Sequence, residues 1–141
     1  FIVAGEGTEF SSVQKLIESE KLPIQLLGWR SDIERVLSAA DALLLTSDNE
    51  GTPIASIQAS LLGVPTISTN VGSLSDIVIN GKTGILSSTS VQDLYQEILK
   101  VYDNPKVLEE LGSAARTFAQ QKFSVKRFLQ EYENLYLSLL D

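Results

Sequence analysis

The sequence contains no cysteine and no histidine. Without cysteine the chain has no disulfide, no thiol nucleophile and no thiolate metal ligand. Without histidine it lacks the commonest general base of enzymes, the Ser-His-Asp arrangement and most zinc sites. Any chemistry therefore depends on carboxylates, lysine, tyrosine, hydroxyl groups or backbone N–H groups.

Long apolar runs and net positive charge are missing as well. No stretch approaches the ~18 apolar residues of a membrane-spanning helix, and no signal-peptide pattern opens the chain. The formal net charge of −7 repels phosphate backbones, so we expect no general binding of nucleic acid. A length of 141 residues with 43% hydrophobic and 21% charged residues is typical of one globular domain.

Short apolar segments alternate with segments of helical periodicity. The apolar segments predict strands at residues 1–5, 24–28, 42–46, 65–69 and 84–87. The periodic segments predict helices at residues 8–21, 31–40, 54–62, 74–79, 91–102, 106–122 and 125–140. Such alternation forms right-handed βαβ units, so we expect a Rossmann-like α/β domain with a parallel sheet and a helical C-terminal tail. The apolar stripe of the last helix is more typical of core than of a partner surface, and part of it would face a missing domain if the chain is a fragment.

Ligands of parallel α/β sheets bind outside the carboxyl ends of the strands. The glycines Gly5 and Gly7 follow the first strand and begin a Gly-x-Gly-x-x-Gly dinucleotide pattern. However, Phe10 replaces the third glycine, and Glu6 places negative charge where a pyrophosphate would lie. A tight turn that lines a cleft is the favoured interpretation, with an NAD-type site as the alternative.

Glu50 lies in the Gly/Pro-bearing turn SDNEGTP, between a buried strand and a helix. The first N–H groups of a helix have no partner within it, and the helix dipole attracts anions. Gly51 lets the backbone approach a ligand, and Pro53 suits a first helical position, so the turn predicts a phosphate site. Glu50 would accept hydrogen bonds from ligand hydroxyls or would only complement the helix dipole, and the residues alone leave both open.

Other loop and helix residues are weaker candidates. Gln58 shares a helix face with Ile54 and could bind ribose hydroxyls, although the pattern alone favours an exposed glutamine. Trp29 and Arg30 could stack on a base, or be a half-buried indole beside a surface guanidinium. Gly72 lies in a second glycine turn before a helix, where a structural turn is favoured.

The segment EGTPIASIQASLLGVPTISTNVGSLSDIVINGKTGIL, residues 50–86, resembles the donor-site signature of retaining glycosyltransferases of family 4, which have the two-domain GT-B fold. The segments VAGEGTE, LLGWRSDIERVLSAADALLLTS and FAQQKFSVKRFLQEYENLY also match the family's order of elements. The resemblance therefore covers nearly all of the chain.

This resemblance implies that residues 1–141 are most of the C-terminal domain, which binds the nucleotide-sugar donor. It implies that Glu50 is the catalytic-site carboxylate that contacts donor-sugar hydroxyls and that Gln58 binds the ribose. The loop with Trp29 and Arg30 corresponds to the segment that meets the base. The remaining expected donor-binding residues are Gly5, Gly7, Gly51, Thr52, Ile54, Ala55 and Gly72.

The reaction implied by the resemblance is sugar transfer to an acceptor hydroxyl with retention of anomeric configuration and without a bound metal or other cofactor. The acceptor-binding N-terminal domain and the first βα unit, with its diphosphate-binding Arg and Lys, are expected to precede Phe1. The chain alone is therefore expected to be inactive. The cytosolic pool of nucleotide sugars predicts a cytoplasmic location, which is compatible with peripheral contact at the inner membrane face through the missing domain.

The sequence departs from the family pattern at three positions. Gln58 replaces the second Glu of the signature, Ser73 its second Gly, and Asp76 a position where Glu is frequent. A neutral amide loses a charge-assisted hydrogen bond, so we expect weaker or altered nucleotide binding. The alternatives are a non-catalytic nucleotide-sugar-binding or partner domain with a decayed donor site, another GT-B member such as a nucleotide-sugar epimerase, and a dinucleotide-dependent oxidoreductase.

Overall fold

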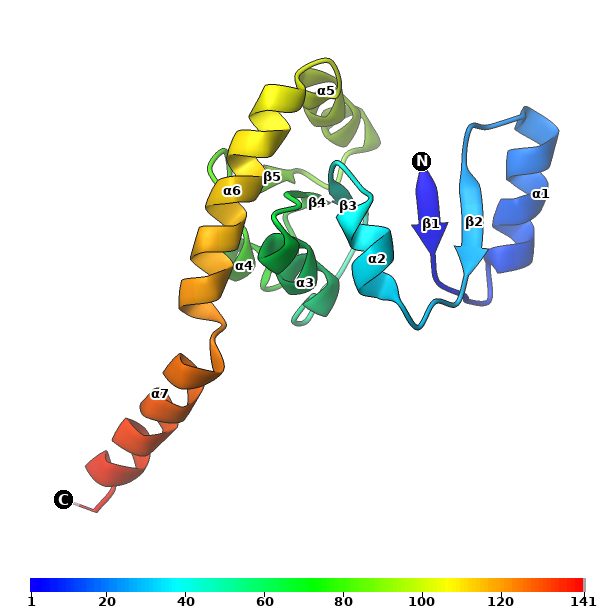
Figure 1. Cartoon of the computed structure of the whole chain (residues 1–141). Coiled ribbons are helices and arrows are strands. Elements are labelled where there is room, and N and C mark those ends of the chain that lie inside the picture. The colour runs from blue at the N-terminus through cyan, green and yellow to red at the C-terminus, as the bar shows by residue number, and fades with distance from the viewer. Residues whose placement is uncertain (141) are drawn as a thin grey trace. The chain divides into compact units, whose positions relative to one another are not determined.

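The computed structural model describes residues 1–140, and these form two compact units (Figure 1). The first unit is Phe1–Val36 and the second is Leu37–Asp141. Their boundary falls within helix α2, Ile33–Ser38. Each unit is built from parallel strands and helices.

The first unit is a single βαβ motif. Strand β1 (Ile2–Ala4) is followed by helix α1 (Phe10–Glu20) and strand β2 (Gln25–Gly28), and the two strands pair in parallel. Helix α1 lies beside β2 in Figure 1. The helix ends at Lys21, whose left-handed backbone (φ 53°) lets its N–H reach the Ile17 carbonyl.

The second unit holds a three-stranded parallel sheet in the order β3-β4-β5. The strands are β3 (Leu43–Leu45), β4 (Thr66–Thr69) and β5 (Gly84–Ser87). The helices are α3 (Ile54–Leu62), α4 (Leu74–Ile77), α5 (Val91–Tyr102), α6 (Pro105–Lys122) and α7 (Val125–Ser138). All four residues of the central strand β4 are buried, as is usual for a strand in the middle of a parallel sheet covered by helices.

The predicted fold class is confirmed, because parallel strands alternate with covering helices and the chain ends in a helix. The predicted single sheet differs from the structure, where β1 and β2 pair separately from β3, β4 and β5. Helix α4 ends two residues earlier than predicted, because Val78 is extended (φ −116°, ψ 121°). The prediction that α7 packs as core is wrong for the described residues, since none of its side chains is buried.

The core of the second unit consists of two apolar clusters. The first is formed by side chains of the sheet and of helices α5 and α6. Its buried residues are Ile67, Ile85, Leu94, Val101 and Leu111. The second lies under α4, with the buried residues Leu74, Ile77 and Val78. Partly buried side chains from β3, α3 and the end of α6 complete it, among them Leu45, Ile57 and Phe123. The second cluster therefore supports the loops that follow β3 and β4.

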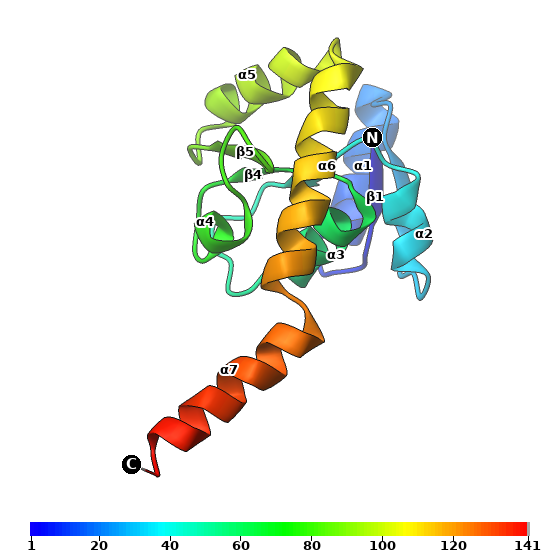
Figure 2. The same ribbon diagram turned by 60° about the vertical axis from the view of Figure 1, so that its left-hand side comes forward.

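Helix α6 crosses α3 at a close contact between two glycines (Figure 2). Gly112 is buried, and a Cβ atom added to it would lie 3.0 Å from the carbonyl carbon of Gly63 and 3.2 Å from Cδ of Pro65. Gly63 ends α3 in the left-handed conformation, with φ 81°. The crossing fixes α3 against α6 and so supports the helix that begins after Glu50.

We expect Gly112→Ala to lower the free energy of unfolding by ~1–3 kcal/mol, because overpacking at the crossing outweighs the ~1 kcal/mol by which alanine favours a helix. Urea denaturation measures the change. The matched control is Ser113→Ala on the exposed side of the same helix, which should be neutral or slightly stabilising. An unchanged or higher stability of Gly112→Ala would contradict the proposed close crossing.

Candidate functional site

The Glu50 side chain is held by the loop in which it lies. Glu50 is half-buried, and its Oε1 accepts a hydrogen bond of 2.6 Å from the hydroxyl of Ser47. The carbonyl of Ser47 in turn accepts a 2.6 Å hydrogen bond from the buried Thr69 hydroxyl at the end of β4. The carboxylate is therefore connected through two hydrogen bonds to the central strand of the sheet.

The backbone of Glu50 is held by the second glycine turn. Gly72 has φ +56°, and a Cβ atom added there would lie 2.7 Å from the carbonyl carbon of Glu50 and closer still to its oxygen. The neighbouring Ser73 hydroxyl donates to the carbonyl of Gly51. Only glycine fits at position 72. The turn therefore has a structural role, as the sequence analysis favoured.

Helix α3 begins directly after this turn. Pro53 is the N-cap residue (φ −71°, ψ 89°), and its carbonyl accepts from the N–H groups of Ser56 (3.0 Å) and Ile57 (3.4 Å). The predicted helix bounds, 54–62, are confirmed, and Pro53 lies at the N-cap instead of the first helical position that it was said to suit; its fixed φ suits both places. No side chain among the described residues caps this helix end. The amides of Ile54 and Ala55 precede the first helical hydrogen bond, so they can serve a ligand.

Gln58 is exposed on the same helix, one turn after the exposed Ile54. The opposite side of α3 is buried, where the hydroxyls of Ser56 and Thr66 lie 2.9 Å apart. Gln58 therefore lies on the open side of the helix, as the spacing predicts, and its amide is accessible to a ligand.

Helix α4, which follows the Gly72 turn, is also held at its other end. The Lys122 ammonium donates to the Asp76 carbonyl. The same ammonium lies 5.3 Å from the ring centroid of Phe118 and 5.8 Å from that of Phe123, distances at which cation–π attraction operates. These contacts keep α4, and with it the Gly72 turn, in place.

The glycine candidates of the first unit form a tight turn next to the end of β2. The Gly5 N–H donates to the Gly28 carbonyl (2.8 Å), and the Gly7 carbonyl accepts from Phe10 (3.1 Å). The Glu6 carboxylate accepts from the Trp29 amide at 3.2 Å. Glu6 thus binds the backbone of the next loop, which gives its charge a structural use that the sequence did not reveal.

Trp29 and Arg30 differ in their freedom to contact a ligand. Trp29 is 70% exposed, so of the two alternatives left open by the sequence the half-buried indole does not hold, and the ring is available for stacking. The Arg30 guanidinium makes a bidentate ion pair with Asp32, at 2.8 and 2.7 Å. The hydrogen bond from Arg30 lowers the pKa of the Asp32 carboxyl. The pair lies at the surface, so a ligand can reach the guanidinium.

The predicted site residues divide between the two units. Gly5, Gly7, Trp29 and Arg30 belong to Phe1–Val36, and the remaining ones belong to the unit that begins at Leu37. In the second unit the structure brings Glu50, Gly51 and Gly72 into direct proximity, whereas Thr52 is exposed beside them in sequence. Ser47, whose hydroxyl donates to the Glu50 carboxylate, is not among the residues predicted from the sequence.

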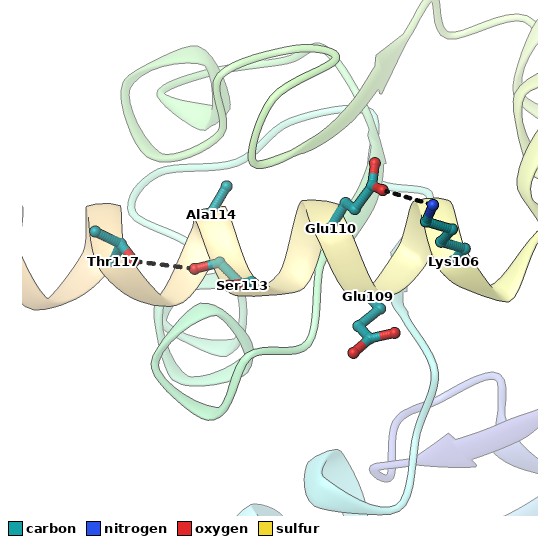
Figure 3. A pocket seen from close by; sticks show the side chains of 6 residues that line it. All are labelled: Lys106, Glu109, Glu110, Ser113, Ala114 and Thr117. Carbon is teal, nitrogen blue, oxygen red and sulfur yellow. Dashed lines mark hydrogen bonds and ion pairs between the residues drawn. The ribbon is translucent and has the colours of Figure 1, made fainter.

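A hollow on α6 offers no competing site. Its lining side chains all come from this one helix (Figure 3). Lys106 and Glu110 form an exposed ion pair of 3.9 Å there, and Thr117 donates to the carbonyl of Ser113. The hollow contains none of the predicted site residues, and a single helix surface does not converge polar groups on a ligand.

Comparison with known proteins identifies the family. Residues 1–118 match the family described as Glycosyl transferases group 1. The chain belongs to this family. It is 26% identical over 99% of its length to N-acetyl-alpha-D-glucosaminyl L-malate synthase of Bacillus anthracis, and 33% identical over 98% to 2-deoxystreptamine N-acetyl-D-glucosaminyltransferase of Niallia circulans.

The fold comparison agrees with this membership. The structure of HepE from Anabaena in complex with UDP is 25% identical to this chain, with a TM-score of 0.86 over 97% of this chain and 40% of that one. The chain spans 37% of the length of the Bacillus and Niallia relatives. Among residues 1–140, no helix is both long and apolar enough to cross a membrane.

The contribution of the Gly72 contact to stability can be measured separately from the strain of the left-handed backbone at this residue. We expect Gly72→Ala to lower the free energy of unfolding by ~1–2 kcal/mol from the conformation and by a further ~1–3 kcal/mol from the collision with Glu50. The matched control is Gly81→Ala, since Gly81 also has a positive φ (73°) but open space around it. Urea denaturation and the amide NMR shifts of Glu50 and Gly51 measure both effects. Equal destabilisation by the two variants, with unchanged shifts, would contradict the contact.

Proposed function

We propose that the chain is the C-terminal, donor-binding domain of a retaining family 4 glycosyltransferase with the GT-B fold. The proposal depends most on one observation: a carboxylate, Glu50, is fixed by side-chain and backbone contacts directly before the uncapped N-terminus of α3. In the full-length protein this domain would present a nucleotide sugar for transfer to an acceptor hydroxyl. Membership of the glycosyltransferase family and the UDP complex of the similar HepE support this reading.

The two chemical parts of this site suit the two parts of a nucleotide sugar. The free amides and positive potential at the start of α3, around Gly51, Thr52, Ile54 and Ala55, suit a diphosphate. The Glu50 carboxylate, which a phosphate would repel, suits the neutral hydroxyls of the sugar. As the diphosphate leaves, its growing negative charge would be stabilised by these preorganised N–H groups and by basic side chains, without a metal ion.

The nucleoside would be bound by residues that match the family signature less closely than Glu50 and Gly51 do. Gln58, on the open side of α3, would accept from one ribose hydroxyl and donate to the other. For the Phe1–Val36 unit we propose that the Gly5–Gly7 turn lines the donor site and that the exposed Trp29, with Arg30, contacts the base. Both assignments derive from the resemblance and from the exposure of these groups.

The remaining parts of the enzyme would come from polypeptide outside residues 1–141. The chain spans 37% of the length of the Bacillus and Niallia relatives. We propose that a preceding βα unit and an N-terminal acceptor domain complete the protein, that the chain alone has no transferase activity, and that the complete enzyme works in the cytoplasm. Peripheral contact with the membrane would involve the acceptor domain.

A second candidate function is a non-catalytic nucleotide-sugar-binding or partner domain. The observation that favours it is Gln58, which stands where the family signature has Glu. Loss of one charge-assisted hydrogen bond weakens ribose binding but does not abolish it. The intact Glu50 support favours the enzyme, since a decayed site has no need of a fixed carboxylate.

We expect Glu50→Gln to weaken binding of a nucleotide sugar ~10-fold and to leave the affinity for the matching nucleoside diphosphate unchanged, because the lost charge-assisted bond is made to the sugar. Calorimetry on the complete protein with UDP-glucose, GDP-mannose and ADP-glucose, each with its diphosphate, measures this. The matched control is Asp48→Asn, an exposed charge change in the same loop. Equal weakening of sugar and diphosphate ligands by Glu50→Gln would contradict the sugar role.

Restoring the signature carboxylate should improve the nucleotide site. We expect Gln58→Glu to raise the affinity for the nucleoside diphosphate ~5-fold, because charged hydrogen bonds are about twice as strong as neutral ones. Gln92→Glu, at an exposed position of α5, makes the same charge change elsewhere and should have no effect. If neither variant changes the affinity, Gln58 does not contact the ribose.

A further inference from the structure

We infer that Ser47 is a positioning residue that aims one oxygen of Glu50 at the donor sugar. The inference rests on the proposed function of Glu50 and adds a residue to which neither the family match nor the resemblance assigned a role. Ser47 Oγ donates to Oε1 of Glu50 at 2.6 Å. No residue among 1–140 donates a hydrogen bond to Oε2, so this oxygen is the acceptor left for a ligand.

The short hydrogen bond restricts the carboxylate. O–H···O⁻ bonds of 2.5–2.7 Å are charge-assisted and strong, at roughly twice the strength of neutral ones. A glutamate side chain in a loop otherwise has several rotamers, and binding would have to select one of them. With Oε1 engaged by Ser47, Glu50 meets a ligand already oriented.

Ser47 is fixed from the sheet in turn. Its carbonyl accepts from Thr69 Oγ1 at 2.6 Å, and Thr69 is buried, with 3% of its surface exposed. Thr69 is the last residue of the central strand β4 and pairs with Ser87 of β5, so its backbone is held in the sheet. The two hydrogen bonds that join Thr69 to Ser47 and Ser47 to Glu50 therefore fix the carboxylate relative to the central strand.

The backbone and the side chain of Glu50 are thus constrained separately, by the turn after β4 and by the last residue of β4. Gly72 contacts the backbone, while Thr69 acts on the side chain through Ser47. Loss of the Ser47 hydroxyl would release the carboxylate and leave the turn and the start of α3 unchanged. The expected consequence is a defect in recognition of the sugar without a defect in recognition of the diphosphate.

The test uses Ser47→Ala, Ser47→Thr, Glu50→Ala and the double variant Ser47→Ala/Glu50→Ala in the complete protein. Calorimetry with UDP-glucose, GDP-mannose and ADP-glucose, each against its nucleoside diphosphate, gives the ratio of sugar to diphosphate affinity. We expect Ser47→Ala to lower this ratio ~5-fold, Ser47→Thr to restore it, and Ser47→Ala to have no further effect in the Glu50→Ala background. The exposed Ser75→Ala is the control.

A second readout needs no ligand. The ¹³C NMR shift of the Glu50 carboxyl carbon should change in Ser47→Ala and return in Ser47→Thr. Suppose that Glu50→Ala lowers the ratio of sugar to diphosphate affinity. The role of Ser47 is then overturned if Ser47→Ala changes neither this ratio nor the ¹³C shift, or if the two substitutions are additive in the double variant. If Glu50→Ala leaves the ratio unchanged, the proposed sugar role of Glu50 fails, and the role of Ser47 fails with it.

Discussion

The close approach of the Gly72 turn to the backbone of Glu50 is the contact on which the candidate site depends. Neighbouring parallel strands end at the same edge of a sheet, so the loops after β3 and β4 necessarily meet there. A residue with a Cβ atom at position 72 would push the Glu50 carbonyl away. The position of the Glu50 backbone and the start of α3 both follow from this contact.

The support beneath the site is polar but uncharged. Thr69 and Ser47 hold the carboxylate, and the hydroxyls of Ser56 and Thr66 join α3 to β4 in the buried interior. Buried hydroxyls with hydrogen-bond partners cost little, whereas a buried charge would cost several kcal/mol. The charge of Glu50 is thereby held by uncharged groups at the loop, where it can serve a ligand.

Local features of the site were predictable from the sequence, and contacts between distant segments were not. The Gly/Pro turn before an apolar helix predicts the start of α3, apart from the one-residue shift at Pro53. The hydrogen bond from Thr69 to Ser47 joins residues 22 positions apart, and no pattern of residue types predicts it. Strand pairing was also beyond the sequence, because an apolar run predicts a strand but not its neighbour.

The most direct test of the account is an NMR titration of the isotope-labelled chain with UDP, GDP, ADP and NAD. We predict that one nucleoside diphosphate shifts the amides of residues 51, 52 and 54–58, because the start of α3 holds the diphosphate and Gln58 the ribose. Shifts produced by NAD and confined to residues 5–8 would contradict it and would instead support a dinucleotide site at the Gly5–Gly7 turn.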